Sequence, residues 1–393
     1  MHGATVNVSR KIFSVLFLTI FVTTLGLGIV APLMPIFAES LGATGIWLGI
    51  IFSGFSLSRV VFMPIIGKLS DRKGRKLFIT SGLLLYAILS LLYPLAKSVM
   101  VLVGVRLVHG FASAMVFPIA MAYVGEIAKE GTEGKTMGTF NLAMFLGMGA
   151  GPFLGGVVKD AFGFPAAFYS MSALTAVAFF ISLFLLPDVM SVSKNRKRQS
   201  IKELLKSDTM KGVLIFRLVS SMGRASIMAF LPIIASGFHI TTTQIGIILS
   251  SLIFFTALLQ RPFGKLADRY NKVHQVLVGS IVATLPLFAI PFSEGFLSLF
   301  VIGAFIGVGS AIAMPSASAI SVIIGQDIGM GATMGVFSSA MSVGMIIAPV
   351  LSGVVMDLVG LRWVFYVAGI LSSVGIFLFY YFAKHDERFK AKL

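Results

Sequence analysis

The chain has 393 residues, of which 57% are hydrophobic and 12% are charged, and its formal net charge is +16. Ordinary soluble proteins carry roughly 25% charged residues, so this composition excludes a soluble globular protein and indicates an integral membrane protein. The sequence contains no cysteine, which excludes disulfide bonds, thiolate metal sites and cysteine nucleophiles.

Long apolar runs follow one another along the whole chain. Lipid offers no hydrogen-bond partner to an open strand edge, and the runs reach about 18 residues or more, so they predict membrane-spanning helices and not barrel strands. The first run follows Arg10 and Lys11 and is too long for a signal-peptide core, so we expect it to be retained. The predicted spans are 12–37, 45–66, 77–96, 99–123, 136–158, 165–186, 211–236, 244–263, 275–292, 297–320, 332–355 and 361–383.

Lysine and arginine are distributed unequally between alternate connections. With the N-terminus inside, the inside segments carry 23 of these residues and the outside loops carry three, Lys97, Lys159 and Arg362. The positive-inside rule therefore predicts that both termini lie in the cytoplasm. We expect a multi-pass protein of a prokaryotic cytoplasmic (inner) membrane. Because the positive charge is a topology signal, we expect no nucleic-acid partner.

A polar segment at residues 187–210 divides the chain near its middle. We predict an N-terminal six-helix bundle at 1–186, a cytoplasmic linker at 187–210, a C-terminal six-helix bundle at 211–383 and a cytoplasmic tail at 384–393.

The second half of the chain repeats landmarks of the first half at a constant offset of 197 residues. Matching pairs include Pro35 and Pro232, Gly49 and Gly246, Asp71 and Asp268, Pro152 and Pro349, and Asp160 and Asp357. An even number of spans in each half gives both halves the same topology. The predicted fold is an all-α membrane protein with twelve transmembrane helices in two six-helix bundles, related by a parallel pseudo-twofold repeat, and such a fold places a site near the midplane.

The connection between the second and third spans reads GKLSDRKGRK from Gly67, and a shortened copy, GKLADR, starts at Gly264. This pattern resembles the signature loop of the major facilitator superfamily, G-x-x-x-D-[RK]-x-G-R-[RK]. The resemblance implies a cytoplasmic latch in which an arginine reaches a carboxylate near the end of the fourth span, where Glu126 lies. Solvated surface charge is the alternative. The residues concerned are Gly67, Asp71, Arg72, Gly74, Arg75, Glu126, Asp268 and Arg269.

The fifth span is rich in small residues at regular spacing. Gly147, Gly151 and Gly155 recur every four residues and form a flat strip on which another helix can pack closely, and Pro152 favours a kink. The positions Gly138, Gly147, Gly151, Pro152, Gly155 and Gly156 resemble the antiporter motif of the drug:proton antiporters within the same superfamily. The fourth span is similar to the R-x-x-Q-G motif of the twelve-span branch, with His109 in place of the usual glutamine.

Five basic side chains lie inside predicted spans: Arg59, Arg106, His109, Arg217 and Arg224. Ionisable groups in a membrane are costly and usually functional, although arginines that contact carbonyl groups in helix packing are the alternative. No aspartate or glutamate lies within a span, so the membrane carboxylate of many such exporters is missing. We interpret His109 as the proton carrier, because it is the span residue that titrates near neutrality.

These observations predict a secondary active transporter that works by alternating access. The resemblance favours proton-coupled export of small amphipathic compounds, as in multidrug efflux. The alternative is transport of organic anions or anionic lipids, because arginine binds carboxylate or phosphate in a bidentate manner. We expect a monomer in the lipid bilayer with a small-molecule substrate and protons as partners, no enzymatic activity, no cofactor and no metal.

Overall fold

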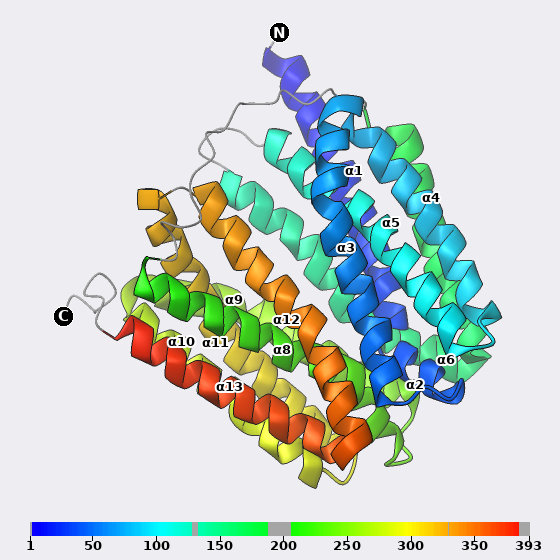
Figure 1. The fold of residues 1–393 in the computed structure, drawn as a ribbon. Helices are drawn as coiled ribbons and strands as arrows, with labels where there is room; N and C mark the ends of the chain where they lie inside the picture. Colours follow the sequence, from blue (N-terminus) through cyan, green and yellow to red (C-terminus); the bar gives the residue numbers. More distant parts are fainter. Residues whose placement is uncertain (1, 128–132, 188–205, 329, 385–393) are drawn as a thin grey trace. The chain divides into compact units, whose positions relative to one another are not determined.

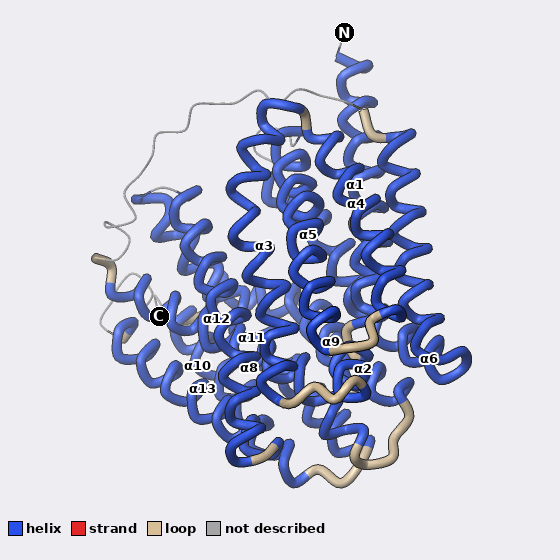
Figure 2. The backbone as a smooth tube through the Cα atoms, turned by 45° about the vertical axis from the view of Figure 1, so that its right-hand side comes forward, coloured by secondary structure: helices blue, strands red, loops and turns tan. Residues whose placement is uncertain are grey.

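The structure is a computed structural model that describes residues 2–127, 133–187, 206–328 and 330–384, with the backbone alone for Asp268 and a few others. Within these residues the regular elements are all helices, joined by short connections (Figures 1 and 2). The predicted all-helical architecture is confirmed. The predicted linker and tail lie almost entirely outside the described residues.

The helices of the first half are α1 (His2–Val30), α2 (Leu33–Ser40), α3 (Gly45–Lys73), α4 (Arg75–Leu92), the short 3-10 helix η1 (Tyr93–Leu95), α5 (Val99–Ile127) and α6 (Glu133–Leu185). Those of the second half are α8 (Asp208–Ser236), α9 (Thr242–Arg269), α10 (Lys272–Ala289), the 3-10 helix η2 (Ile290–Phe292), α11 (Phe296–Ile328), α12 (Met330–Val359) and α13 (Leu361–Ala383).

In the described part of the chain, 11 helices are long and apolar enough to cross a membrane. One of them, α6, has 53 residues and contains two of the predicted spans. Its backbone is non-helical at Gly163, with φ of 84° and ψ of 175°, which bends the helix between those spans. The first predicted span, 12–37, differs in another way. It is split between α1 and α2 around Pro32, which has no amide hydrogen to continue the helix.

The helix boundaries repeat at the offset seen in the sequence. Shifted by 197 residues, α4 coincides with α10 and η1 coincides with η2 at both ends. The bend at Gly163 corresponds to the break before α13, where Gly360 has φ of 103°. Positive φ at both positions favours glycine, because a Cβ atom would strain this backbone. The predicted parallel repeat is confirmed.

The residues pack into two compact units, each of which includes a short segment from the other half of the sequence. Unit 1 comprises Met1–Ala43, Gly54–Asn195 and Thr241–Gly246, and unit 2 comprises Thr44–Ser53, Arg196–Ile240 and Ile247–Leu393. Apolar side chains such as Leu16, Ile79 and Val116 fill the core of unit 1, and Val213, Val276 and Ile320 lie in that of unit 2.

The short segments that group with the other half of the sequence are the first turns of α3 and α9. An aspartate of the same unit caps each of them. In unit 1, Asp160 Oδ2 accepts hydrogen bonds from Thr243 N and Thr243 Oγ1, both at 2.7 Å. In unit 2, Asp357 accepts from Gly45 N at 2.6 Å and from Ile46 N at 2.8 Å. A carboxylate at a helix N-terminus satisfies free amides and complements the helix dipole. The two caps are related by the repeat offset.

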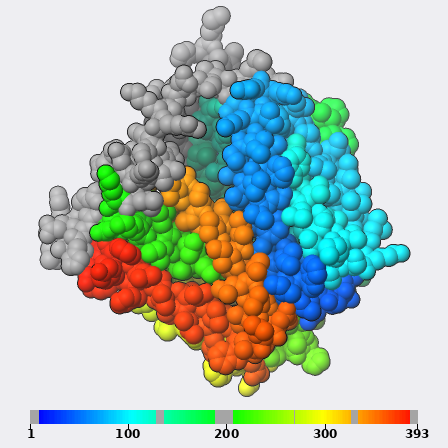
Figure 3. All heavy atoms as spheres, viewed as in Figure 1, coloured from blue at the N-terminus to red at the C-terminus, as the bar shows by residue number. Residues whose placement is uncertain are grey.

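Large apolar side chains lie on the surface of several helices. On α3, Leu57 is 47% exposed, Val61 51% and Ile65 50%. Figure 3 shows side chains of α3 at the surface in blue. Soluble proteins rarely expose such continuous apolar surface, whereas a bilayer covers it with lipid.

Candidate functional site

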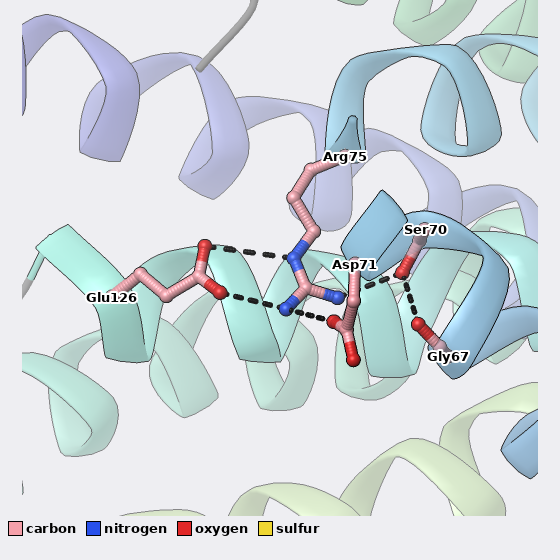
Figure 4. A network of polar contacts seen from close by, with 5 residues as sticks. All are labelled: Gly67, Ser70, Asp71, Arg75 and Glu126. Atoms are coloured by element: carbon pink, nitrogen blue, oxygen red, sulfur yellow. Dashed lines mark hydrogen bonds and ion pairs between the residues drawn. The ribbon is translucent and has the colours of Figure 1, made fainter. Parts of the chain in front are cut away.

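Arg75 is the centre of a polar network at the end of α3 (Figure 4). Its Nη2 atom lies 2.6 Å from Asp71 Oδ1 and 2.7 Å from Glu126 Oε1. Its Nη1 atom donates to Ser70 Oγ at 2.7 Å, and Ser70 Oγ in turn donates to the Gly67 carbonyl oxygen at 2.8 Å. The arginine is only 5% exposed, so its charge is neutralised where water has little access.

The local sequence explains how Arg75 reaches these partners. Gly74 separates α3 from α4 with φ of 91°, which permits an abrupt change of direction that places Arg75 at the first position of α4. Asp71 lies in the last turn of α3, four residues before Arg75, and Glu126 comes from the end of α5. Arg72, by contrast, is exposed on the surface. No sequence pattern predicts the contact between Ser70 and Arg75, because the turn at Gly74 brings the two side chains together.

The equivalent connection in the second half is built differently. Asn271 caps α10, and its Oδ1 atom accepts from Val273 N at 2.9 Å and His274 N at 3.2 Å. Lys272 stands where the repeat has Arg75, and Ile323 stands where it has Glu126. Arg269 is exposed, and the side chain of Asp268 lies outside the described part of the structure.

The glycine strip of α6 lies directly against α1. A Cβ atom added to Gly151 would collide with the backbone of Gly28, and one added to Gly155 would collide with the carbonyl oxygen of Ile29. The strip therefore brings two helix backbones into contact. Two other motif positions differ. At Gly156 an added Cβ would meet the start of α9, whereas at Gly138 it would meet no atom within 4 Å. Pro152 lies within α6, next to the strip.

His109 is fully buried among aromatic rings in unit 1. Its Nδ1 atom is 2.6 Å from the hydroxyl oxygen of Tyr93, and its ring centroid is 3.8 Å from that of Tyr86. Its Nε2 atom and the hydroxyl of Tyr86 are both buried, and neither has a hydrogen-bond partner among the described residues. A buried imidazole with one bonded nitrogen and one unbonded nitrogen retains the capacity to take up or donate a proton.

The two arginines of unit 1 lie near the same aromatic cluster. The Arg106 guanidinium is 4.5 Å from the ring centroid of Phe55 and hydrogen-bonds the side chain of Tyr93. The Arg59 guanidinium lies 5.7 Å from the ring centroid of Phe117. The structure thus brings Arg106 and His109 together through Tyr93. Cation–π contacts partly replace the hydration that these cations lose.

The two arginines of α8 belong to unit 2. Arg217 donates to the sulfur atoms of Met314, at 3.1 Å, and Met341, at 2.8 Å, which are weak acceptors. Its Nε atom is buried and has no partner among the described residues. Arg224, seven residues later, lines a cavity inside unit 2. The described residues contain no group of three histidine, cysteine, aspartate or glutamate side chains that could hold a metal ion.

Comparisons with known proteins agree with this architecture. The sequence profile described as Major Facilitator Superfamily matches residues 16–216 and 213–392. An uncharacterized MFS-type transporter of Methanocaldococcus jannaschii is 33% identical over 376 residues, covering 94% of this chain and 97% of that protein. Multidrug resistance protein 2 of Bacillus subtilis is 27% identical over 390 residues, covering 94% and 95%.

A crystal structure of a bacterial homolog to the human lysosomal transporter Spinster has the same fold. It aligns with a TM-score of 0.83 and 12% sequence identity, covering 97% of this chain and 98% of that one. The family match spans both halves of the repeat, and so do the relatives. The chain therefore belongs to the major facilitator superfamily.

Proposed function

We propose that this transporter exports small amphipathic compounds across a prokaryotic inner membrane in exchange for protons. The observation that carries the proposal is the similarity over nearly the whole chain to a multidrug resistance protein. The close contact between α1 and the glycine strip of α6 supports it, because these glycines occupy the positions of the antiporter motif. Alternating access then moves the substrate between the two sides.

His109 is the proposed proton carrier. It is buried, and its Nε2 atom has no partner among the described residues. In the tautomer whose Nδ1–H donates to the Tyr93 hydroxyl, Nε2 takes up a proton without loss of a hydrogen bond. Arg106 acts on it through Tyr93, which contacts both side chains. Protonated His109 and Arg106 repel each other. His109 therefore holds its proton only when nearby groups compensate for the added positive charge. Such a carrier releases its proton readily when the conformation changes.

Transport of a fluorescent lipophilic cation, such as ethidium, into proteoliposomes tests the proposal. The purified protein is reconstituted, and a proton gradient is imposed with the acidic side inside. We expect gradient-driven accumulation of the dye that a protonophore abolishes. His109→Gln should leave dye binding intact but remove the dependence on the gradient, whereas His274→Gln, at an exposed histidine of α10, should behave as the wild type. Equal dye accumulation by the wild type with and without the proton gradient would rule out proton coupling.

A second function is favoured by the arginines of unit 2. Arg217 and Arg224 lie on one helix, and neither forms an ion pair with a described acidic residue. Two such cations suit an organic anion. Replacing the dye by a fluorescent carboxylate in the same proteoliposomes separates the two functions. Uptake of the carboxylate that Arg224→Ala abolishes, with no uptake of the cation, would assign this transporter to organic anions.

A further inference from the structure

A cavity of about 60 Å³ lies inside unit 2, between α8, α9, α10, α11 and α13. One water occupies roughly 10–15 Å³ by this measure, so the cavity has room for about four waters. Pockets for drug-sized molecules measure roughly 300–1,000 Å³. The cavity is therefore too small for an amphipathic drug and must be explained in another way.

The repeat shows why the cavity exists in unit 2. Ala283 and Ile306 line it, and the equivalent positions of unit 1 hold Tyr86 and His109. In unit 1 those two rings pack against each other with centroids 3.8 Å apart and fill the space. Because Ala283 is much smaller than a tyrosine, the same backbone leaves a cavity in unit 2.

Arg224 contributes a positive charge to the wall of this cavity. The equivalent residue of unit 1 is Leu27. In the described part of the chain, no hydrogen bond or ion pair joins the Arg224 guanidinium to another side chain. An isolated cation inside a protein in a membrane is very costly, so a counter-charge close to the guanidinium would stabilise the folded state.

Hydroxyl groups surround the same space. Thr284 and Ser372 line the cavity and are each only 7% exposed, and Ser220 and Ser310 also line it. No hydrogen bond joins the hydroxyls of Thr284 and Ser372 to other residues within the described ranges. Several other buried serines and threonines donate to the carbonyl oxygen one turn earlier, as Ser280 does to Val276 at 2.6 Å. These two hydroxyls are therefore available as donors to a ligand.

We propose that this cavity is a binding site for a small inorganic anion of the size and charge of chloride. The guanidinium supplies the charge and several N–H donors, the hydroxyls of Thr284 and Ser372 supply further donors, and the volume admits a halide with one or two waters. The anion is a fixed part of unit 2 that neutralises Arg224. The site lies in unit 2, apart from the proposed proton carrier His109 of unit 1, and halide binding is measured without transport, so failure of this proposal and failure of proton-coupled export are distinguishable.

The thermal stability of the detergent-purified protein tests this site. The melting temperature is measured while potassium gluconate is replaced by potassium chloride or bromide at constant ionic strength. Because the anion binds the folded state, we expect a saturable rise of a few degrees with both halides and none with gluconate, which is too large for the cavity. Arg224→Met should abolish the rise. Arg261→Met, at an exposed arginine of α9, should keep it, because Arg261 does not line the cavity.

Two milder variants keep the test decisive if Arg224→Met does not fold. Thr284→Val and Ser372→Ala each remove one hydroxyl, and each should raise the half-saturating chloride concentration about tenfold. A bromide-soaked crystal should show an anomalous peak beside the Arg224 guanidinium. The proposal would be overturned if chloride did not change the melting temperature or if gluconate had an equal effect. It would also be overturned if the half-saturating chloride concentration were unchanged in both hydroxyl variants.

Discussion

The two halves of the repeat share several helix boundaries but bring their helices together differently. The strip on α6 is Gly147, Gly151 and Gly155, and its counterpart on α12 is Gly344, Ala348 and Ser352. A Cβ atom at Gly151 would collide with the backbone of Gly28, whereas Ala348 accommodates its own Cβ while only 2% exposed. The repeat therefore fixes the path of the backbone, and the side chains decide how closely the helices approach.

The same contrast extends to the polar groups. Unit 1 joins α3, α4 and α5 through buried Arg75, whereas the described residues at the equivalent end of unit 2 show the Asn271 cap and a hydrogen bond from Gln275 Nε2 to the Phe263 carbonyl oxygen. Aromatic rings fill the interior around His109, whereas the equivalent space in unit 2 is a cavity beside Arg224. Substitutions that exchange these features between the halves measure how much each contributes.

The largest effect is expected from Gly151→Ala, which gives the first half the residue that the second half already has. The added methyl group meets backbone atoms of Gly28, which move only if the whole helix shifts, so we expect a loss of about 3 kcal/mol of stability. The measurement is the melting temperature in detergent. Gly138→Ala is the matched control, since nothing lies within 4 Å of the new Cβ and alanine favours a helix. Equal losses in both variants would contradict the close approach of α1.

Arg75→Met should have the next largest effect. It leaves Asp71 and Glu126 close together without their shared cation, and we expect a loss of about 2 kcal/mol, less than for a fully buried pair because both carboxylates are partly exposed. Lys272→Met makes the equivalent change in the second half, where no such network is present among the described residues, and it should change stability by less than about 0.5 kcal/mol. Similar melting temperatures for the two variants would remove this difference between the halves.

Tyr93→Phe removes only the hydroxyl that contacts His109 Nδ1. The imidazole nitrogen is then left buried without its partner, and we expect a loss of about 1.5 kcal/mol. The dependence of dye transport on the proton gradient should also change, because Tyr93 connects Arg106 with His109. Ile290→Val changes the equivalent position of the second half and should leave that dependence as in the wild type. Wild-type coupling in Tyr93→Phe would separate the hydroxyl from proton transfer.

Asn271→Ala should have the smallest effect of the four. It removes a cap that accepts from two backbone amides at the start of α10, and such caps contribute about 1 kcal/mol. Asn271→Ser keeps an acceptor at this position and should restore most of the stability. If the alanine and serine variants melt at the same temperature, the cap does not hold this connection.

The sequence predicts the helices and the repeat because glycine, proline and apolar residues act on the backbone locally. Equivalent glycines and prolines lie 197 residues apart in the sequence, and α10 and η2 lie 197 residues after α4 and η1 in the structure. Other features depend on residues that meet only after folding. The predicted boundary between spans 136–158 and 165–186 coincides with the bend at Gly163, but the sequence does not indicate that helical structure continues on both sides of the bend as the single element α6.

The candidate sites were predictable to different degrees. The resemblance of the loop at Gly67 to a known signature indicated a carboxylate partner near Glu126, and Arg75 contacts Glu126 in the structure. The cavity beside Arg224 gives no signal in the sequence, because it results from the small size of Ala283 across the bundle. A cavity forms between the side chains of several helices, so no local sequence pattern predicts it.

The aspartate cap on α3 has a consequence for the synthesis of the chain. The hydrogen bond from Gly45 N to Asp357 joins residues 312 positions apart, and its acceptor lies close to the C-terminus. Helices emerge from the ribosome in order, from the N-terminal end. The first backbone amides of α3 therefore lack this acceptor until α12 has entered the membrane. A ribosome that stalls before Asp357 leaves a nascent chain with a helix end still open to competing partners.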